Sequence, residues 1–418
     1  MSKNPHNLYW TIFIIVIAFL SFRVSILVSA GAGKAIAQYG ADAGNYLMRT
    51  QVMWGIIGFL VLFATLNIPY TKYASWQMPF FWEKNITDGK RTKRFPLPVV
   101  GLFVISVLLV VVYFCHPKNG THRWIPLGLF SFQPSELARY AFIFYFSWTL
   151  TRENTVPIQN YFRGLMPKFL LMIAFITLIV FEPHFSATGI IFAISFVLFY
   201  FARARVPHLF ATYAVVAILG LSLMLMVNEN RRTRFYDFLG IKTEQVKIIP
   251  KVGLSQNEQA LVAFGRGGIT GVTAGKSVQR DNFLPEPTTD FVFAIIGEEY
   301  GFIGASVLIG AFILIILQGL RIALYTKDEF GKLLAIGLTT SLGLQVLINM
   351  TVTLGLFVNT GLPLPFISDG GTSLIVSSFA VGVLLNIARS SSESADDENI
   401  SEIIDDGKLQ KELAFPQL

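Results

Sequence analysis

The sequence has little of what builds disulfide-bonded or metal-centred proteins. It contains one cysteine, Cys115, in 418 residues, which excludes an internal disulfide framework and a metal site made from several cysteines. Its five histidines are scattered, and none pairs with another at metal-ligand spacing. Charged residues make up only 14% of the chain, compared with about 25% in a typical soluble domain. The sequence therefore indicates neither a resident metal centre nor a soluble fold.

The general catalytic motifs are also missing. There is no P-loop, no His-Glu-x-x-His zinc motif, no Gly-x-Ser-x-Gly nucleophile elbow and no dinucleotide-binding fingerprint. The glycine-rich residues 265–268 lack the strand–turn–helix context that a phosphate-binding loop requires. Chemistry is therefore expected from carboxylates and cations near the outer membrane edge.

Long hydrophobic runs are what the sequence has in abundance. Hydrophobic residues make up 53% of the chain, and the mean hydropathy is +0.57. The runs are about 17–25 residues long, which is enough to cross a bilayer as an α-helix. The first run is too long for a cleavable signal peptide, so we interpret it as a retained span. We predict an all-α, polytopic membrane protein with about ten transmembrane helices and one large external loop. The predicted spans are residues 8–28, 53–68, 98–115, a span ending near 150, 169–181, 185–201, 209–227, 291–317, 334–357 and 374–387.

Basic residues in the short loops predict the side of the membrane on which each loop lies. The loop after the second span contains six lysines and arginines against two acids, which places it in the cytoplasm. Ten spans then put both termini in the cytoplasm and the long polar interval, about residues 228–289, outside. We assign residues 1–390 to the membrane domain and residues 391–418 to an acidic, disordered cytoplasmic tail. Because the net charge of +7 lies mainly in loops, lipid headgroups are favoured over nucleic acid as partners.

Asp290 stands out because of its place in the chain. Pro285 and Pro287 block a regular helix before it, and a long apolar run begins directly after it at Phe291. An acid at the edge of a hydrocarbon region is desolvated, and such groups tend to be functional. The alternative is structural, because aspartate is also a favoured residue at a helix start. These residues alone leave both interpretations open.

Other polar groups in or near the predicted spans have structural interpretations. Arg23 lies within the first apolar run, so we expect it to face the helix bundle or to snorkel outward. Glu136 and Arg139 are three residues apart on one helix face, the spacing of an ion pair. Gln345 and Asn349 are interpreted as interhelical hydrogen-bonding residues.

Four blocks of residues recur together in the order of a known family. They read Arg123-Trp124-Ile125; Gln133-Pro134-Ser135-Glu136-Leu137-Ala138-Arg139; Leu284-Pro285-Glu286-x-x-Thr289-Asp290-Phe291 with Gly297-Glu298-Glu299-x-Gly301; and Pro363-Leu364-Pro365-Phe366-Ile367-Ser368-x-Gly370-Gly371-Thr372-Ser373. Together they resemble the signature blocks of the SEDS proteins, a name that covers shape, elongation, division and sporulation. The resemblance extends over about residues 10–390. Residues 259–268 and 276–279 are more similar to the division-type, FtsW-like branch than to the elongation-type, RodA-like branch.

The resemblance implies a peptidoglycan glycosyltransferase of the bacterial cytoplasmic membrane. Such a protein polymerises lipid II into glycan strands at the outer face during division or elongation, and it releases polyprenyl diphosphate. The resemblance also implies a class B penicillin-binding protein as partner, which crosslinks the product, together with other divisome or elongasome proteins. No nucleic acid is implied.

The resemblance further implies roles for individual residues. The essential acid of the family falls on Asp290, which we assign as catalytic. Six residues are assigned to substrate binding: Trp124, Arg139, Arg266, Lys276, Glu286 and Ser368. The chain departs from the family pattern at Thr288, where histidine is common, at Asp369, where tyrosine is common, and at residues 182–184, which replace the usual Gln-Pro-Asp. These departures change the local hydrogen bonding.

The hypothesis for the reaction is general-base catalysis by Asp290. The carboxylate would take the proton from the 4-hydroxyl of the acceptor N-acetylglucosamine as that oxygen attacks the anomeric carbon of the donor muramyl sugar. The leaving diphosphate is a weak base and needs charge neutralisation, from arginine, lysine or a divalent cation such as Mg²⁺ or Mn²⁺. Glu298 and Glu299 lie about 12 Å further along the helix, too far to share one proton transfer. We interpret them as buried structural acids or as polar groups of the cavity.

Two other functions remain open. A transporter that flips lipid II without chemistry would also use intramembrane charges and broken helices, and it would depend on midplane charges such as Arg23 or Glu298. A division scaffold would tolerate loss of Asp290 and depend on its loops and tail. A transferase, in contrast, requires an acid at the outer edge.

Overall fold

The computed structural model describes most of the predicted membrane domain and part of the long external interval. The described residues are 5–39, 43–78, 95–115, 123–126, 131–152, 156–182, 185–227, 256–279, 284 and 287–414. Glu286 and residues 228–255 of the predicted external loop lie outside the described residues.

The described chain is built almost entirely from helices. These are α1 (Pro5–Tyr39), α2 (Ala43–Asn67), α3 (Tyr70–Ser75), α4 (Leu97–Val111), α5 (Pro134–Thr151), α6 (Met166–Phe181), α7 (Phe185–Phe201), α8 (Val206–Val227), α10 (Gln256–Gly267), α12 (Val292–Tyr325), α13 (Glu329–Thr353) and α14 (Gly371–Ala414). Two short antiparallel hairpins pair β1 (Gln77–Met78) with β2 (Phe95–Pro96) and β3 (Ile125–Pro126) with β4 (Ser131–Phe132).

The predicted all-α, polytopic architecture is confirmed. Each of the ten predicted spans coincides with a helix: α1, α2, α4, α5, α6, α7, α8, α12, α13 and α14. Among the described residues, seven helices are long and apolar enough to cross a membrane, and Ser186–Phe201 and Val206–Gly220 are shorter apolar helices. α2 begins ten residues before the predicted start at Met53.

The last helix corrects one prediction. α14 continues to Ala414, so residues 391–414 are helical where we predicted a disordered tail. Extending an existing helix avoids the cost of nucleating a new one. Several glutamates, lysines and leucines in this segment are also good helix formers.

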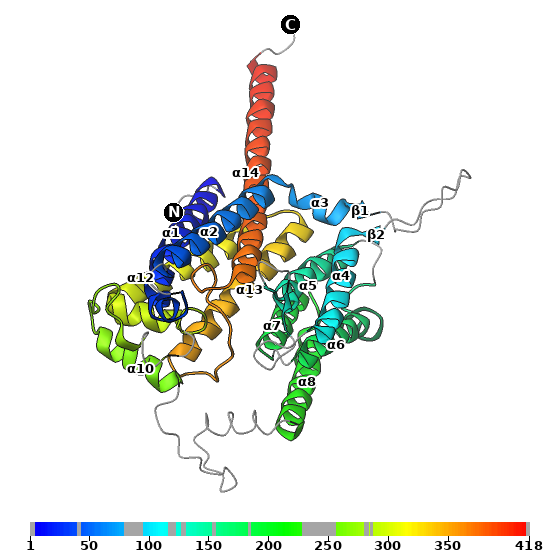
Figure 1. Cartoon of the computed structure of the whole chain (residues 1–418). Helices are drawn as coiled ribbons and strands as arrows, with labels where there is room; N and C mark the ends of the chain where they lie inside the picture. Colours follow the sequence, from blue (N-terminus) through cyan, green and yellow to red (C-terminus); the bar gives the residue numbers. More distant parts are fainter. Residues whose placement is uncertain are drawn as a thin grey trace, which may run out of the picture.

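The helices are arranged so that the predicted loops separate to two ends of the bundle. The C-terminal end of α14 and the β1–β2 hairpin lie at the top of Figure 1, and α10 and the end of α8 lie at the bottom. This separation agrees with the predicted topology. The assignment of the upper end to the cytoplasm stays a prediction.

Small residues allow α2 and α14 to pack closely. A Cβ atom at Gly382 of α14 would lie 1.9 Å from Thr65 Oγ1, and one at Gly58 of α2 would lie 3.1 Å from the side chains of Leu374 and Ser378. Close backbone approach of this kind is typical of helix pairs in membranes. At the upper end of this helix pair, Asn386 donates to Leu66 O at 2.6 Å and accepts from Tyr70 N at 2.8 Å.

α12 is interrupted at Gly301, whose backbone has φ 64° and ψ −164°. The interruption frees backbone groups, and the segment after α10 binds them. Val272 N donates to Glu298 O at 3.0 Å, and Phe302 N donates to Gly268 O at 2.9 Å. A Cβ at Gly301 would lie 2.4 Å from the backbone nitrogen of Gly271. Glycine is therefore required where α10 and its following loop pack on α12.

Candidate active site

Asp290 lies in a turn of residues 287–290 immediately before α12. The N-cap position of α12 is occupied by Phe291, with no side-chain capping hydrogen bond. Asp290 is therefore not the capping residue, and the structural interpretation that the sequence left open is not supported. Asp290 is half-buried, and it lies just before the start of α12, whose first eight residues are buried.

Three consecutive carbonyl groups of this turn accept hydrogen bonds from other parts of the chain. Asp369 N donates to Thr288 O at 2.8 Å. Ser368 Oγ donates to Thr289 O at 2.5 Å. Asn349 Nδ2 donates to Asp290 O at 3.0 Å. The turn that carries the acid is thus held from two sides, by the loop before α14 and by α13.

The loop before α14 is itself fixed by side chains of α13. Gln345 Nε2 donates to Pro363 O at 2.7 Å, and Asn349 Nδ2 donates to Leu362 O at 2.7 Å. Ser368 Oγ also accepts from Leu364 N at 2.7 Å, which closes the loop on itself. These contacts confirm the expectation that α13 contributes hydrogen-bonding polar residues, although the partners are loop carbonyls instead of another helix. Irregular backbone at this depth requires such partners.

The side chain of Asp290 lies beside Gly361 and in the field of Arg123. A Cβ at Gly361 would lie 3.5 Å from Asp290 Oδ2, so the carboxylate fits against a position without a side chain. Burial lowers the pKa of Arg123, while the negative charges of Glu182 and Asp290 act in the opposite direction. Arg123 Nε donates to Glu182 O at 3.1 Å. The guanidinium is therefore tied to the α6–α7 turn and lies within the electrostatic influence of Asp290.

Glu182 is the acidic partner at the far side of Arg123. It occupies the C-cap position of α6 and is fully buried. Burial raises the pKa of Glu182 to about 8, and the Ser135 hydroxyl and the Arg123 charge oppose this rise. Two acids of different character, half-exposed Asp290 and buried Glu182, therefore both act on the charge of Arg123.

The structure places the predicted substrate-binding residues in different surroundings. Trp124 is half-buried directly before β3, next to Arg123. Ser368 is buried and hydrogen-bonds the backbone of the Asp290 turn, so its contact in this structure is structural. Lys276 is exposed in the loop after α10. Glu286 lies outside the described residues.

Two predicted cations are paired with glutamates. Arg139 is buried in α5, with Nη2 3.6 Å from Glu136 Oε2 and its guanidinium over the Tyr140 ring. Arg266 Nε lies 3.5 Å from Glu298 Oε1. Both arrangements suit structural ion pairs.

Glu298 and Glu299 fasten the external segment to the bundle. Glu298 accepts from Ser277 Oγ and, at 3.2 Å, from Val278 N. Glu299 accepts from Ser29 Oγ at 2.6 Å and from Gly275 N at 3.0 Å. Their contacts are those of buried structural acids, one of the two roles we expected for them.

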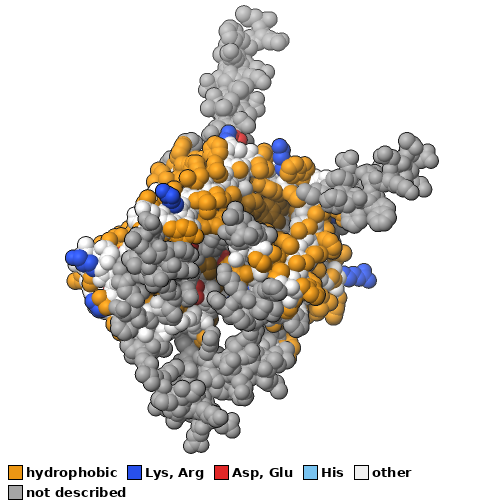
Figure 2. Space-filling model, in the orientation of Figure 1, with side chains coloured by type: hydrophobic (Ala, Val, Ile, Leu, Met, Phe, Trp, Pro, Cys, Tyr) orange, Lys and Arg blue, Asp and Glu red, His pale blue; other side chains and the backbone are white. Residues whose placement is uncertain are grey.

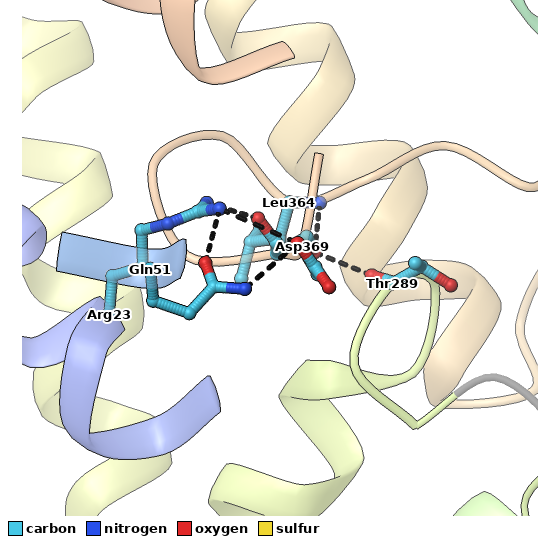
Figure 3. A network of polar contacts seen from close by, with 6 residues as sticks. Arg23, Gln51, Thr289, Leu364 and Asp369 are labelled. Carbon is cyan, nitrogen blue, oxygen red and sulfur yellow. Dashed lines mark hydrogen bonds and ion pairs between the residues drawn. The ribbon is translucent and has the colours of Figure 1, made fainter. Parts of the chain in front are cut away.

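The sequence did not single out two features of the site. Arg123 was part of a recognised block, and only its electrostatic interaction with Asp290 in the structure shows that it is a candidate cation. Arg23 and Asp369 were each noted as unusual. In the structure Arg23 Nη2 lies 3.8 Å from Asp369 Oδ1, so the acid that departs from the family pattern is the counter-ion of the buried arginine (Figure 3). The sequence contained one signal for this ion pair, namely an arginine within an apolar span and an acid of unexplained role in the same membrane domain.

The face shown in Figure 2 is mostly hydrophobic, and it is hollowed between the part built from α2 and α14 and the part built from α4 and α5. Acidic side chains are visible in the central recess. Among the described residues, no group of three or more histidine, cysteine, aspartate or glutamate side chains is placed to hold a metal ion. The fold and site together define a polytopic membrane protein with an acid–cation site at one end of its helix bundle.

Comparisons with known proteins place this class more narrowly. The family model of FtsW, RodA and SpoVE, described as a cell cycle protein, matches residues 90–393. A probable peptidoglycan glycosyltransferase FtsW of Geobacter sulfurreducens is 30% identical over 377 residues, which cover 90% of this chain and 94% of the relative. Stage V sporulation protein E of Bacillus subtilis is 30% identical over 376 residues, covering 90% and 96%. The chain therefore belongs to the FtsW/RodA/SpoVE family, the SEDS proteins.

Solved structures share the fold. RodA of Thermus thermophilus matches with a TM-score of 0.61 at 22% identity, covering 91% of this chain and 97% of the other. A chain of a peptidoglycan synthase complex that coordinates polymerization and crosslinking matches with a TM-score of 0.69 at 21% identity, covering 91% and 98%.

Proposed function

We propose that this protein is a peptidoglycan glycosyltransferase that polymerises lipid II at the outer face of the bacterial cytoplasmic membrane. The family membership and the names of the relatives support the activity. The observation that carries the mechanism is Asp290, held on a fixed turn before the start of α12, where its charge acts on Arg123.

Asp290 acts as the general base. Its carboxylate accepts the proton of the acceptor 4-hydroxyl as that oxygen bonds to the donor anomeric carbon with inversion. The bond between that carbon and the diphosphate oxygen breaks, and its electron pair leaves with the polyprenyl diphosphate. Clamping of the three turn carbonyls supports this role, because a base must be held in one geometry to act efficiently.

Arg123 neutralises charge on the leaving diphosphate. Its planar guanidinium can bind two phosphate oxygens at once, and burial of the site strengthens the attraction. A divalent cation would supply further neutralisation of the diphosphate.

The hydrophobic hollow between α2–α14 and α4–α5 suits the polyprenyl chains of the substrate (Figure 2). Polyprenyl tails remain in the bilayer while the sugars react at its surface, so a membrane-facing apolar surface must adjoin the site.

We assign the chain to the division-type branch, which the FtsW relatives support. The partner we propose is a class B penicillin-binding protein. We also propose that both termini of this chain lie in the cytoplasm.

The experiment that tests the mechanism is polymerisation of purified lipid II by the Asp290→Asn protein. Product chains are sized by gel electrophoresis, with and without the partner. We expect a loss of at least about 100-fold in rate with normal yield and thermal stability. The matched control is Asp328→Asn, which alters a helix N-cap acid that accepts from Gly331 N at 2.8 Å and should keep full activity. Near-normal chain growth by Asp290→Asn would remove this residue from the mechanism.

The same samples separate polymerase from transporter. A flippase moves lipid II across vesicle membranes without forming glycan and would not depend on an acid at the outer edge. Translocation in vesicles that survives Asp290→Asn, together with no polymer from the wild-type protein, would favour the transporter.

A further inference from the structure

A buried arginine on α1 contacts the loop before α14. Arg23 is fully buried, and its Nη1 donates to the carbonyl oxygen of Ser368. Its Nη2 donates to Gln51 Oε1 of α2 at 3.0 Å and lies 3.8 Å from Asp369 Oδ1. Gln51 Nε2 in turn donates to Asp369 Oδ1 at 3.1 Å. Figure 3 shows these side chains converging on the loop from α1 and α2.

The two loop residues held in this way are the same two that hold the catalytic turn. Ser368 donates to Thr289 O, and the backbone nitrogen of Asp369 donates to Thr288 O. The path from Arg23 to the turn therefore consists of direct contacts at each step. It ends one residue before Asp290.

The chemistry of the pair suits positioning better than stabilisation. Arg23 is buried, whereas the Asp369 side chain is 38% exposed, so the cost of burying the arginine offsets much of the attraction and the pair contributes little net stability. An arginine fork, in contrast, fixes several acceptors in one geometry, which lysine cannot do because its charge is concentrated on one nitrogen. Arg23 uses its fork to reach a backbone carbonyl, an amide and a carboxylate.

We propose that Arg23, Gln51 and Asp369 form a positioning cluster that sets the geometry of the turn carrying Asp290. The proposal rests on the function proposed above. Arg23 and Asp369 act through Ser368 and the turn and are positioning residues. The cluster ties the first two helices to the site, although they lie more than 200 residues away from Asp290 in the sequence.

Steady-state kinetics on lipid II provide the first test. Arg23→Lys keeps the charge and loses the fork, so we expect kcat to fall at least tenfold while KM stays within about threefold. The double variant Arg23→Gln/Asp369→Asn removes both charges and leaves no unpaired ion. We expect it to recover thermal stability and not kcat. If the Arg23–Asp369 pair had only a structural role, the double variant would recover thermal stability and kcat together.

A second measurement does not depend on catalysis. In a Cys115→Ser background, which has no other cysteine, Thr288→Cys reports the mobility of the turn through its rate of maleimide labelling. We expect Arg23→Lys to increase this rate several-fold. The matched control is Asn386→Ala, which removes two buried hydrogen bonds from within α14 to the backbone of Leu66 and Tyr70. It should lower thermal stability while leaving kcat and labelling unchanged.

The outcomes distinguish the two proposals. An active Asp290→Asn protein would refute the proposed base, and the labelling rates would still decide whether Arg23 holds the turn. An inactive Asp290→Asn protein together with normal kcat for Arg23→Lys overturns the positioning cluster. Unchanged labelling in Arg23→Lys overturns it as well.

Discussion

At the residue scale, the environment of Arg123 determines how the site handles negative charge. The charge of Asp290 acts on the guanidinium, which donates to the backbone of Glu182. With Glu182 protonated at neutral pH, Arg123 keeps more of its charge available for a diphosphate. Protonated Glu182 is neutral, so it is compatible with phosphate binding at Arg123. An ionised Glu182 would compete with the diphosphate for the charge of Arg123.

We expect Arg123→Gln to reduce kcat/KM for lipid II by about 10–100-fold, because one charge-stabilising donor is lost from the transition state. Arg123→Lys should retain part of the activity, since it preserves charge without the planar fork. Polymerisation kinetics measure both. Arg321→Gln, at an exposed arginine that contacts Gln318, is the control and should behave like the wild type. Equal activity of Arg123→Gln and the wild type would contradict the role of this cation.

Glu182 gives a prediction for the pH dependence of stability. Its pKa is raised to about 8 in the folded protein by burial, above the usual value near 4.5. Between these values the unfolded state loses the proton and the folded state keeps it, so stability falls as pH rises from about 4.5 to 8. Glu182→Gln removes this effect.

We therefore expect Glu182→Gln to raise the stability at pH 8 by about 2–4 kcal/mol and to change it little near pH 4.5. Thermal unfolding in detergent at several pH values measures the difference. Glu329→Gln, whose side chain is 59% exposed, should show no such trend. A difference between Glu182→Gln and wild type that does not change with pH would exclude titration of Glu182 as its cause.

At the scale of elements, the site depends on α12 and on the interruption of this helix at Gly301. α12 carries the Asp290 turn at its start, and its break at Gly301 provides backbone groups that bind the loop after α10. Glu298 and Glu299, in the turn before the break, bind the same loop through their side chains. The external segment is therefore docked on the helix that bears the acid.

Gly301→Ala should destabilise the protein by at least about 2 kcal/mol, because alanine at this φ and ψ is strained and its Cβ would meet the backbone of Gly271. Gly310→Ala in the same helix is the matched control. No atom lies within 4 Å of its added Cβ, so it should be neutral or slightly stabilising. Thermal stability and folded yield provide the comparison. Similar values for the two variants would show that the break is not required.

At the scale of the whole molecule, the site must lie on the outer side of the membrane for the proposed reaction. The cytoplasmic assignment of the loop that follows α2 rests on its basic residues. The structure places α3 and β1, the described residues directly after α2, at the opposite end of the bundle from α10 (Figure 1). The exposed residues Thr71 and Ala274 mark the two ends.

In intact cells a membrane-impermeant maleimide should label Ala274→Cys and not Thr71→Cys, both in a Cys115→Ser background. Permeabilised cells should show labelling at both positions, which controls for accessibility. The reverse pattern in intact cells would place Asp290 on the cytoplasmic side and exclude the proposed polymerase.

Much of the fold could be predicted because the information is local in the chain. The length and spacing of apolar runs identified all ten helices that form the bundle, and the prolines before Asp290 marked the start of α12. The tail was the exception, because hydrophilic composition does not exclude a helix that continues from one already formed.

The sequence by itself determined the class of protein, the order of its helices and, through the resemblance, the acid to test. The tertiary structure alone decided which charges meet. It paired Arg23 with Asp369, which are 346 positions apart in the sequence, and it brought Arg123 under the electrostatic influence of Asp290. It also directed Arg266 to Glu298, whereas the pair of Arg139 with Glu136 follows from their spacing on one helix. Hydropathy is read along the chain, whereas an ion pair depends on how separate helices pack, and that packing is specified only when the whole bundle is assembled.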